Sequence, residues 1–268
     1  MINRLALCVS YDGSRYHGWQ HQEEVISVQQ TLEHALSRVA NQPVTVVCAG
    51  RTDAGVHATG QIVHFDTEAE RTERSWMFGA NSNLPGDISV SFAKSVPNDF
   101  HARFSALART YRYVICNQPV RSGVLQKAVT WYYKPLDAER MQAATPYLLG
   151  EHDFSAYRGS GCQAHHAIRT IHALSVKRHG RMIVVEVTAN AFLLHMVRNI
   201  VGVLLEIGRG EKAPEWAGEV LQTCDRRAGG VTGSPQGLYL VDIDYPAHFG
   251  LPKEPKGPFF LDSLNLGE

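Results

Sequence analysis

Runs of apolar residues along the first part of the chain have the periods of strands and helices. An apolar run between polar turns, or an alternation of apolar and polar positions, is typical of a strand. Ser27 with Gln30 three residues later has the spacing of a helix N-terminal cap, and Pro85–Gly86 ends a second helical pattern. These patterns predict strands over residues 4–11, 44–49, 61–66 and 88–96, and helices over residues 28–41 and 72–84.

The pattern restarts near residue 105. It predicts strands over residues 109–116, 169–178, 181–189 and 237–245, and helices over residues 137–150, 191–208 and 214–224. Each half reads strand, helix, strand, strand, helix, strand, which resembles the order in ferredoxin-like and RNA-recognition (RRM-like) folds. The sequence therefore predicts an α+β protein with two such halves, 1–105 and 106–268, whose antiparallel sheets meet at a central cleft.

The composition is that of an ordinary globular protein, with 268 residues, 44% hydrophobic and 19% charged. No run of 18 apolar residues exists, and the first residues have too short an apolar run for a signal peptide. The five cysteines are scattered and never in a CxxC spacing, which argues against disulfides and a zinc knuckle. We therefore expect a cytoplasmic protein that does not bind a membrane.

The charges are unevenly distributed, although the formal net charge is zero. Residues 100–136 and 154–185 contain no acidic residue, while one is expected about every ten positions. Six basic residues lie in the first window and five, with four histidines, in the second, among several tyrosines and a tryptophan. Arginines among aromatics suit the phosphates and bases of RNA, and strands with solvated basic faces are the alternative.

The helix predicted over residues 191–208 is apolar nearly all round, as a buried helix is. His195, Arg198 and Asn199 would share one of its faces, which Gly202 continues. A buried cation is costly unless it meets an anion. We therefore expect a carboxylate opposite Arg198, either a structural partner or Asp53.

Arg51 and Asp53 lie in a glycine-flanked loop between two predicted strands, within CAGRTDAGVHATGQIVHF, residues 48–65. A plain turn is one interpretation, and a metal site of Asp53 with His57 and His64 is another, although no motif for metal binding accompanies them. A phosphate-binding loop is disfavoured because no GxxxxGK[ST] or strand-linked GxGxxG occurs. The remaining interpretation is an active-site carboxylate that an arginine keeps ionised.

Six segments carry a resemblance to a known family: YDGSRYHGWQ, GRTDAGVHATGQIVHF, NLPGDI, DFHARFSALARTYRY, NAFLLHMVRNIVG and GLYLVDIDYP. In this order they resemble the bacterial tRNA pseudouridine synthase A family, over about residues 5–262. The resemblance implies isomerisation of uridine to pseudouridine at positions 38, 39 and 40 of the tRNA anticodon stem-loop, with base flipping and no cofactor or metal. It also implies a homodimer with the tRNA lying across both subunits.

The resemblance implies roles for four residues. Asp53 matches the catalytic aspartate, a nucleophile or initiating base, and Tyr111 matches the tyrosine that stacks on the uracil. Arg198 matches the arginine that pairs with the aspartate. Arg51 resembles the arginine that enters the space left by the flipped base.

The resemblance also places RNA contacts in both acid-free windows. These are Phe100, His101, Ala102, Arg103 and Phe104, and Gly161, Cys162, Gln163, Ala164 and His165. Pro119 and Ala164 depart from the family, since a basic or polar residue would be natural at both places. For Asp12, Trp19, His57 and His195 we expect structural roles.

Two other functions stay open at this point. A non-catalytic RNA-binding protein explains the basic windows but not a carboxylate opposite a buried arginine. A metal-dependent hydrolase using Asp53 and His57 would be inhibited by a chelator.

Overall fold

The computed structural model describes residues 2–264, which form two compact units. The first unit contains residues 2–109 together with Tyr239–Phe259, and the second contains Thr110–Leu238 with residues 260–264. The first unit thus takes in a segment from the C-terminal part of the chain. The sequence predicts that residues 1–105 and 106–268 form separate halves, and this division stays a prediction.

The first unit is built on a sheet in the order β4-β1-β3-β10. The central strand β1 (Asn3–Tyr11) is antiparallel to β3 (His57–Thr67) and to β4 (Ile88–Val96). β10 (Leu238–Asp244) runs parallel to the start of β3, where Tyr239 pairs with His57. The short β2 (Val47–Cys48) is antiparallel to β3 farther along, opposite His64 and Val63.

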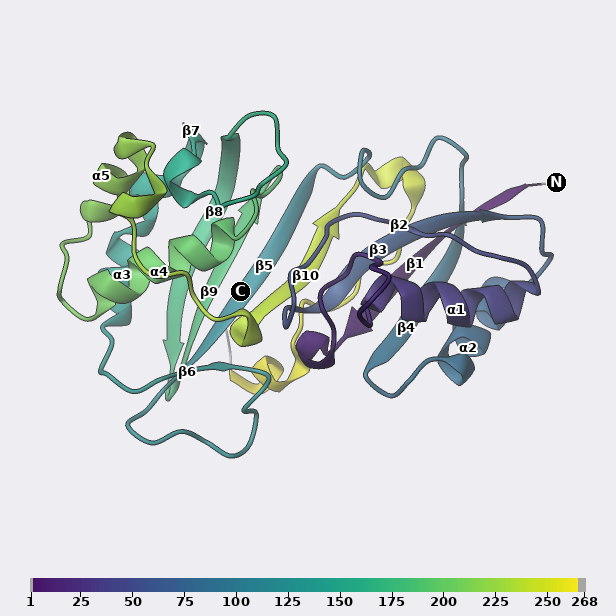
Figure 1. Ribbon diagram of the computed structural model, residues 1–268, viewed down its shortest axis with the longest axis horizontal. Coiled ribbons are helices and arrows are strands. Elements are labelled where there is room, and N and C mark those ends of the chain that lie inside the picture. The colour runs from purple at the N-terminus through teal and green to yellow at the C-terminus, as the bar shows by residue number, and fades with distance from the viewer. Residues whose placement is uncertain (1, 265–268) are drawn as a thin grey trace. The chain divides into compact units, whose positions relative to one another are not determined.

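Helices α1 (Val28–Ala40) and α2 (Glu73–Asn83) pack beside each other in the first unit, and α2 packs against β4 (Figure 1). The Ser27 side chain accepts a hydrogen bond from the Gln30 N–H, as the cap spacing predicts. Asn41 ends α1 in the left-handed conformation. Trp76 of α2 is fully buried and meets the Phe65 ring edge-on at 5.1 Å.

The second unit is built on a sheet in the order β5-β9-β8-β7. Its strands are β5 (Ala108–Asn117), β9 (Met182–Ala189), β8 (Ile168–His179) and β7 (Gly150–Asp153), and β6 (Thr130–Tyr132) runs parallel to β5. β8 and β9 form the antiparallel pair that the sequence predicts. Helix α3 (Ala138–Ala143) packs against β8 and against α4 (Met196–Gly208), and α5 (Trp216–Thr223) follows.

Short 3-10 turns complete the described chain. They are η1 (Gly13–Arg15), η2 (Thr145–Leu148), η3 (Ser155–Tyr157), η4 (Arg226–Ala228), η5 (Pro235–Gly237), η6 (Ala247–Phe249) and η7 (Phe259–Leu264). None of the helices in residues 2–264 is long and apolar enough to cross a membrane.

The α+β class is confirmed. Two strand pairs, β3 with β10 and β5 with β6, are parallel, whereas the sequence analysis expected antiparallel sheets. The helix predicted over residues 191–208 begins only at Met196, because His195 takes a left-handed conformation with φ of 60°. The predicted cleft at the junction of the two halves stays a prediction.

Candidate active site

The loop that carries Arg51 and Asp53 begins at Gly50, whose backbone is held by the buried side-chain amide of Gln61. The Gln61 side chain, which is completely buried, donates from Nε2 to the Gly50 carbonyl at 2.5 Å. Its Oε1 accepts the Gly50 N–H at 3.3 Å. The Ala49 N–H also donates to the Ile62 carbonyl. The side chain of one strand residue therefore fixes the backbone directly before Arg51.

Thr52 is the second anchor of this loop. Its hydroxyl and that of Tyr11 are 2.7 Å apart in a buried hydrogen bond, and its carbonyl accepts the Trp19 N–H at 2.9 Å. A Cβ on Gly18, where φ is +89°, would lie 2.7 Å from the Thr52 carbonyl oxygen. Thr52 is buried, Asp53 is half-buried and Arg51 is exposed. The loop thus presents a carboxylate and a guanidinium from an immobilised backbone.

His57 lies at the end of this loop, and it is buried and stacked on Tyr239. Its Nδ1 lies 3.1 Å from the Gly13 N–H nitrogen and 3.1 Å from Asp12 Oδ1. Only one of these contacts is a hydrogen bond at a time, because an imidazole nitrogen either carries a proton or accepts one. Either contact holds the η1 turn against the start of β3, which fits the structural role expected for Asp12 and His57.

The predicted RNA-contact segment Phe100–Phe104 is also in the first unit. Phe100 and Ala102 are buried, and His101 Nδ1 lies within hydrogen-bonding distance of the Arg103 and Phe104 N–H groups. The Phe104 ring is 75% exposed, stacks on His101 at 4.3 Å, and has the Arg103 guanidinium 5.5 Å from its centre. The segment therefore displays an aromatic face beside a cation.

Arg109 joins this segment to the Asp53 loop. Its Nη2 donates to the Arg103 carbonyl at 2.6 Å and to the Ala49 carbonyl at 3.2 Å. The structure thus brings residues 100–104 together with the loop that carries Arg51 and Asp53. The sequence analysis counted Arg109 only as one of the basic residues of its window.

Two predicted site residues lie on regular elements of the second unit. Tyr111 of β5 is nearly fully buried, and the Phe192 ring meets it edge-on at 5.0 Å. Arg198 lies in the first turn of α4, and its Nε donates to the Gly233 carbonyl at 2.8 Å. The pairing of Arg198 with Asp53 stays a prediction.

The second predicted RNA-contact segment, Gly161–His165, is fixed by Arg158. The Arg158 guanidinium donates to the Cys162 and Ala164 carbonyls at 2.6 and 2.9 Å, while Gly161, Gln163 and His165 are exposed. Burial raises the pKa of the Cys162 thiol, but hydrogen bonds from the Leu194 and Ala164 N–H groups and from Arg158 leave that pKa below its ordinary value. The Leu194 bond ties this loop to the residues before α4.

The family of the chain follows from comparison with known proteins. A sequence model described as tRNA pseudouridine synthase matches residues 7–105 and 144–246. A protein named tRNA pseudouridine synthase A from Coxiella burnetii (strain Dugway 5J108-111) is 60% identical over 258 residues, which cover 96% of this chain and 99% of that protein. Proteins of the same name from Vibrio cholerae serotype O1 and Pseudomonas aeruginosa PAO1 are 57% and 56% identical, over 98% of this chain and 100% and 93% of theirs.

The chain belongs to the tRNA pseudouridine synthase family. The resemblance stated from the sequence motifs is thereby confirmed. The matched ranges contain the Asp53 loop, both predicted RNA-contact segments and Arg198, and Tyr111 lies between them. A member of the tRNA pseudouridine synthase family is an isomerase, which is the class that the sequence analysis predicts.

Proposed function

We propose that this chain converts uridine to pseudouridine at positions 38, 39 and 40 of the tRNA anticodon stem-loop, with Asp53 as the catalytic residue. The observation that carries the proposal is the anchoring of the Asp53 loop. Gln61 holds the Gly50 backbone and Trp19 the Thr52 backbone, on either side of Arg51, while Asp53 stays partly exposed. A reacting group gains rate when it is held in position before the substrate arrives.

The reaction moves one bond. The N1–C1′ glycosidic bond breaks, the uracil turns, and C5 bonds to C1′, after which the C5 proton leaves and N1 gains one. Substrate and product contain the same atoms, so the net reaction consumes no co-reactant. The Asp53 carboxylate starts it as a nucleophile or base, and Arg198 keeps that carboxylate ionised by pairing with it.

A uridine in a stem is stacked and paired, so it must leave the helix before its C1′ can be reached. Arg51, exposed next to Asp53, takes the space that the flipped nucleotide leaves. Tyr111 stacks on the uracil. Its ring is nearly fully buried and supported edge-on by Phe192, so it forms a rigid surface for the base.

The tRNA is held by both acid-free windows. Phe104, supported by His101 and flanked by Arg103, stacks on a base, and the exposed Gln163 and His165 contact the RNA from the second segment. We further propose that the enzyme works in the cytoplasm as a homodimer, with each tRNA lying across both subunits. Local basic segments on a chain of zero net charge favour this arrangement, since two copies present a longer basic surface.

The test is tritium release from tRNA labelled at uracil C5, in the presence of EDTA, by the wild type and by Asp53→Asn. The wild type is expected to release tritium, and Asp53→Asn to release none while binding tRNA as tightly as the wild type. Substrates with a single uridine at 38, 39 or 40 separate the three positions. Turnover by Asp53→Asn would refute the role of Asp53, and no release by folded wild type would refute the proposed activity.

A further inference from the structure

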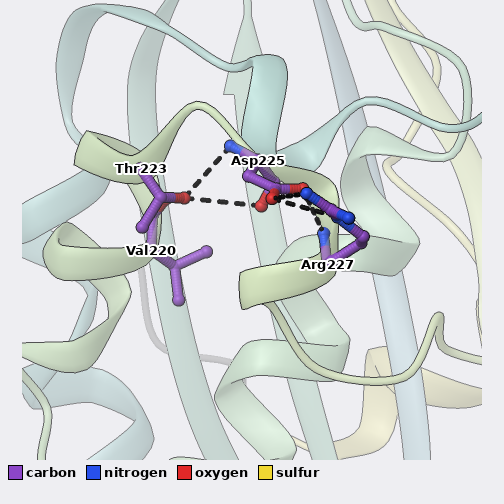
Figure 2. Close-up of polar contacts among 4 residues, drawn as sticks. All are labelled: Val220, Thr223, Asp225 and Arg227. Carbon is purple, nitrogen blue, oxygen red and sulfur yellow. Dashed lines mark hydrogen bonds and ion pairs between the residues drawn. The ribbon is translucent and has the colours of Figure 1, made fainter.

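The segment after α5, residues 225–234, which we name the α4 strap, begins at a hydrogen-bonded turn. The Thr223 hydroxyl donates to the Val220 carbonyl at 2.7 Å and accepts the Asp225 N–H at 3.1 Å. Figure 2 shows this turn with Arg227, whose guanidinium pairs with the Asp225 carboxylate at 2.7 Å. Arg227 is 90% exposed, so this pair is confined to the surface of the turn.

The neighbouring arginine, Arg226, ties the strap to α4. Its Nη2, which carries two N–H groups, lies within hydrogen-bonding distance of three acceptors: Asn199 Oδ1 at 3.0 Å, Thr232 Oγ1 at 2.8 Å and the Gly230 carbonyl at 2.9 Å. The Thr232 hydroxyl donates to Asn199 Oδ1 at 2.7 Å. Asn199 is buried on α4, and its Nδ2 donates to the Tyr157 carbonyl. Two strap side chains thus converge on one buried amide, one residue after Arg198.

The backbones of the strap and of α4 are in direct contact. A Cβ on Gly202 would lie 2.0 Å from the Val231 carbonyl oxygen, and one on Gly230 would lie 2.5 Å from the Gly202 carbonyl oxygen. Both distances are shorter than any side chain tolerates, so the contact requires glycine on both sides. It leaves no room for a side chain between the strap and α4 at this point.

The strap ends on Arg198 itself. The Gly233 carbonyl accepts from Arg198 Nε at 2.8 Å, and the Gly233 N–H donates to the Arg198 carbonyl at 2.9 Å. The next carbonyl, of Ser234, accepts from the Tyr113 hydroxyl on β5, two residues beyond Tyr111. The strap therefore links Arg198 to the strand that carries Tyr111.

We propose that the α4 strap positions the Arg198 guanidinium for the reaction, with Arg226 and Thr232 as positioning residues. The inference rests on the proposed function of Arg198. A guanidinium has five N–H donors on a long flexible side chain. The bond from Nε to Gly233 fixes the plane in which the other four point, and Arg226 and Thr232 fix Gly233 by holding the strap on Asn199.

The experiment compares substitutions of the adjacent residues Arg226 and Arg227, and two substitutions of Thr232 that differ in whether the hydroxyl is kept. Arg226→Gln and Thr232→Val remove the bonds to Asn199, Thr232→Ser keeps the hydroxyl, and Arg227→Gln removes only the surface pair with Asp225. Tritium release and tRNA binding are measured for each folded variant, with enzyme in excess for slow ones. We expect Arg226→Gln and Thr232→Val to lower the rate of the bound complex about 10- to 100-fold at unchanged tRNA affinity. Thr232→Ser and Arg227→Gln should keep the wild-type rate.

The same substitutions in an Arg198→Ala background separate positioning from loss of fold. We expect Arg226→Gln to lower the rate no further there, because neighbours that act through one group are not additive. An equal loss with and without the Arg198 guanidinium, or wild-type rates for both Arg226→Gln and Thr232→Val, would overturn the inference. Wild type that forms no pseudouridine would instead refute the proposed function, and Arg198→Ala at the wild-type rate would refute the role of Arg198.

Discussion

Replacing Gln61 with Met tests whether the buried amide that holds Gly50 orders the Asp53 loop. Met has a similar length and is apolar, so the substitution keeps the volume of a completely buried side chain and removes both hydrogen bonds to Gly50. An unsatisfied polar group costs about 1–3 kcal/mol. Gly50 is partly exposed and water can reach it, so the lower value applies to each of its two groups.

The expected loss is therefore about 2 kcal/mol of unfolding free energy, from about 1 kcal/mol for each lost bond. In a chain of this size this lowers Tm by about 4–8 °C. Because the bonds fix the backbone directly before Arg51 and Asp53, we also expect the rate of tritium release from bound tRNA to fall at least about tenfold. Affinity for tRNA should stay unchanged, since no predicted RNA contact is altered.

The assay is urea denaturation of each variant, with single-turnover tritium release on the same preparations. Gln22→Met is the matched control, because Gln22 is exposed and donates to the His17 carbonyl at 3.1 Å. It should change stability by less than about 0.5 kcal/mol and leave the rate unchanged. Loss of stability by Gln61→Met at the wild-type rate would show that the loop does not need this anchor for the reaction. No loss of either would refute the reasoning from the hydrogen bonds.

Three further predictions concern the predicted RNA-contact segment and His64, which contacts it. Burial, followed by the nearby Arg4 and His101, lowers the pKa of His64 to about 4, and its Nδ1 accepts the Ala102 N–H. A histidine whose folded-state pKa lies below the unfolded value of about 6.5 stabilises the fold above that pH and loses the contribution as pH falls toward 4. Unfolding free energies should therefore decline from pH 6.5 to 4, and less steeply for His64→Gln. An equal decline for the variant would exclude His64 as the cause. Phe104→Ala should weaken tRNA binding by about 1–3 kcal/mol through lost stacking, by the same factor at low and high salt. Arg103→Gln should instead reduce the salt dependence of binding. Leu107→Ala, at an exposed apolar residue three positions after this segment, is the control, and an effect equal to that of Phe104→Ala would refute the stacking role.

Sequence patterns predicted the ends of a helix correctly where the residues that end it are close together in the sequence. The Ser27–Gln30 spacing located the start of α1, because a cap bond spans three residues. The same reasoning placed the start of α4 too early, since residues 191–195 are as apolar as a helix would be. The cause is tertiary: the Leu194 carbonyl and N–H bond to Gly159 and to Cys162 Sγ, which pulls the chain out of helical geometry.

Some residues of the candidate site could likewise be predicted from the sequence, and others could not. The roles of Asp53 and Tyr111 were predicted because their motifs resemble a family, whereas the residues alone left an active-site carboxylate as one of several interpretations of Asp53 and gave Tyr111 no role. The anchoring roles of Gln61 and Arg109 were not predicted, because each side chain donates to a carbonyl elsewhere in the sequence. Gln61 donates to Gly50, and Arg109 donates to Ala49. A side chain that bonds to a distant backbone group leaves no periodic or spacing signal.

The arginines of the acid-free windows stabilise loops of the fold, and we also expect them to attract RNA. Arg109 and Arg158 donate to backbone carbonyls in the described chain, so they fix loops rather than line a solvated strand face. A carbonyl is neutral and does not offset the charge of a guanidinium that donates to it, whereas Glu186, 2.6 Å from Arg112, offsets the charge of that arginine. Such charges act over about 8 Å at physiological salt. Segments without acids would thus let the same residues shape the predicted RNA-contact loops and attract phosphates, which would explain how a chain of zero net charge binds tRNA.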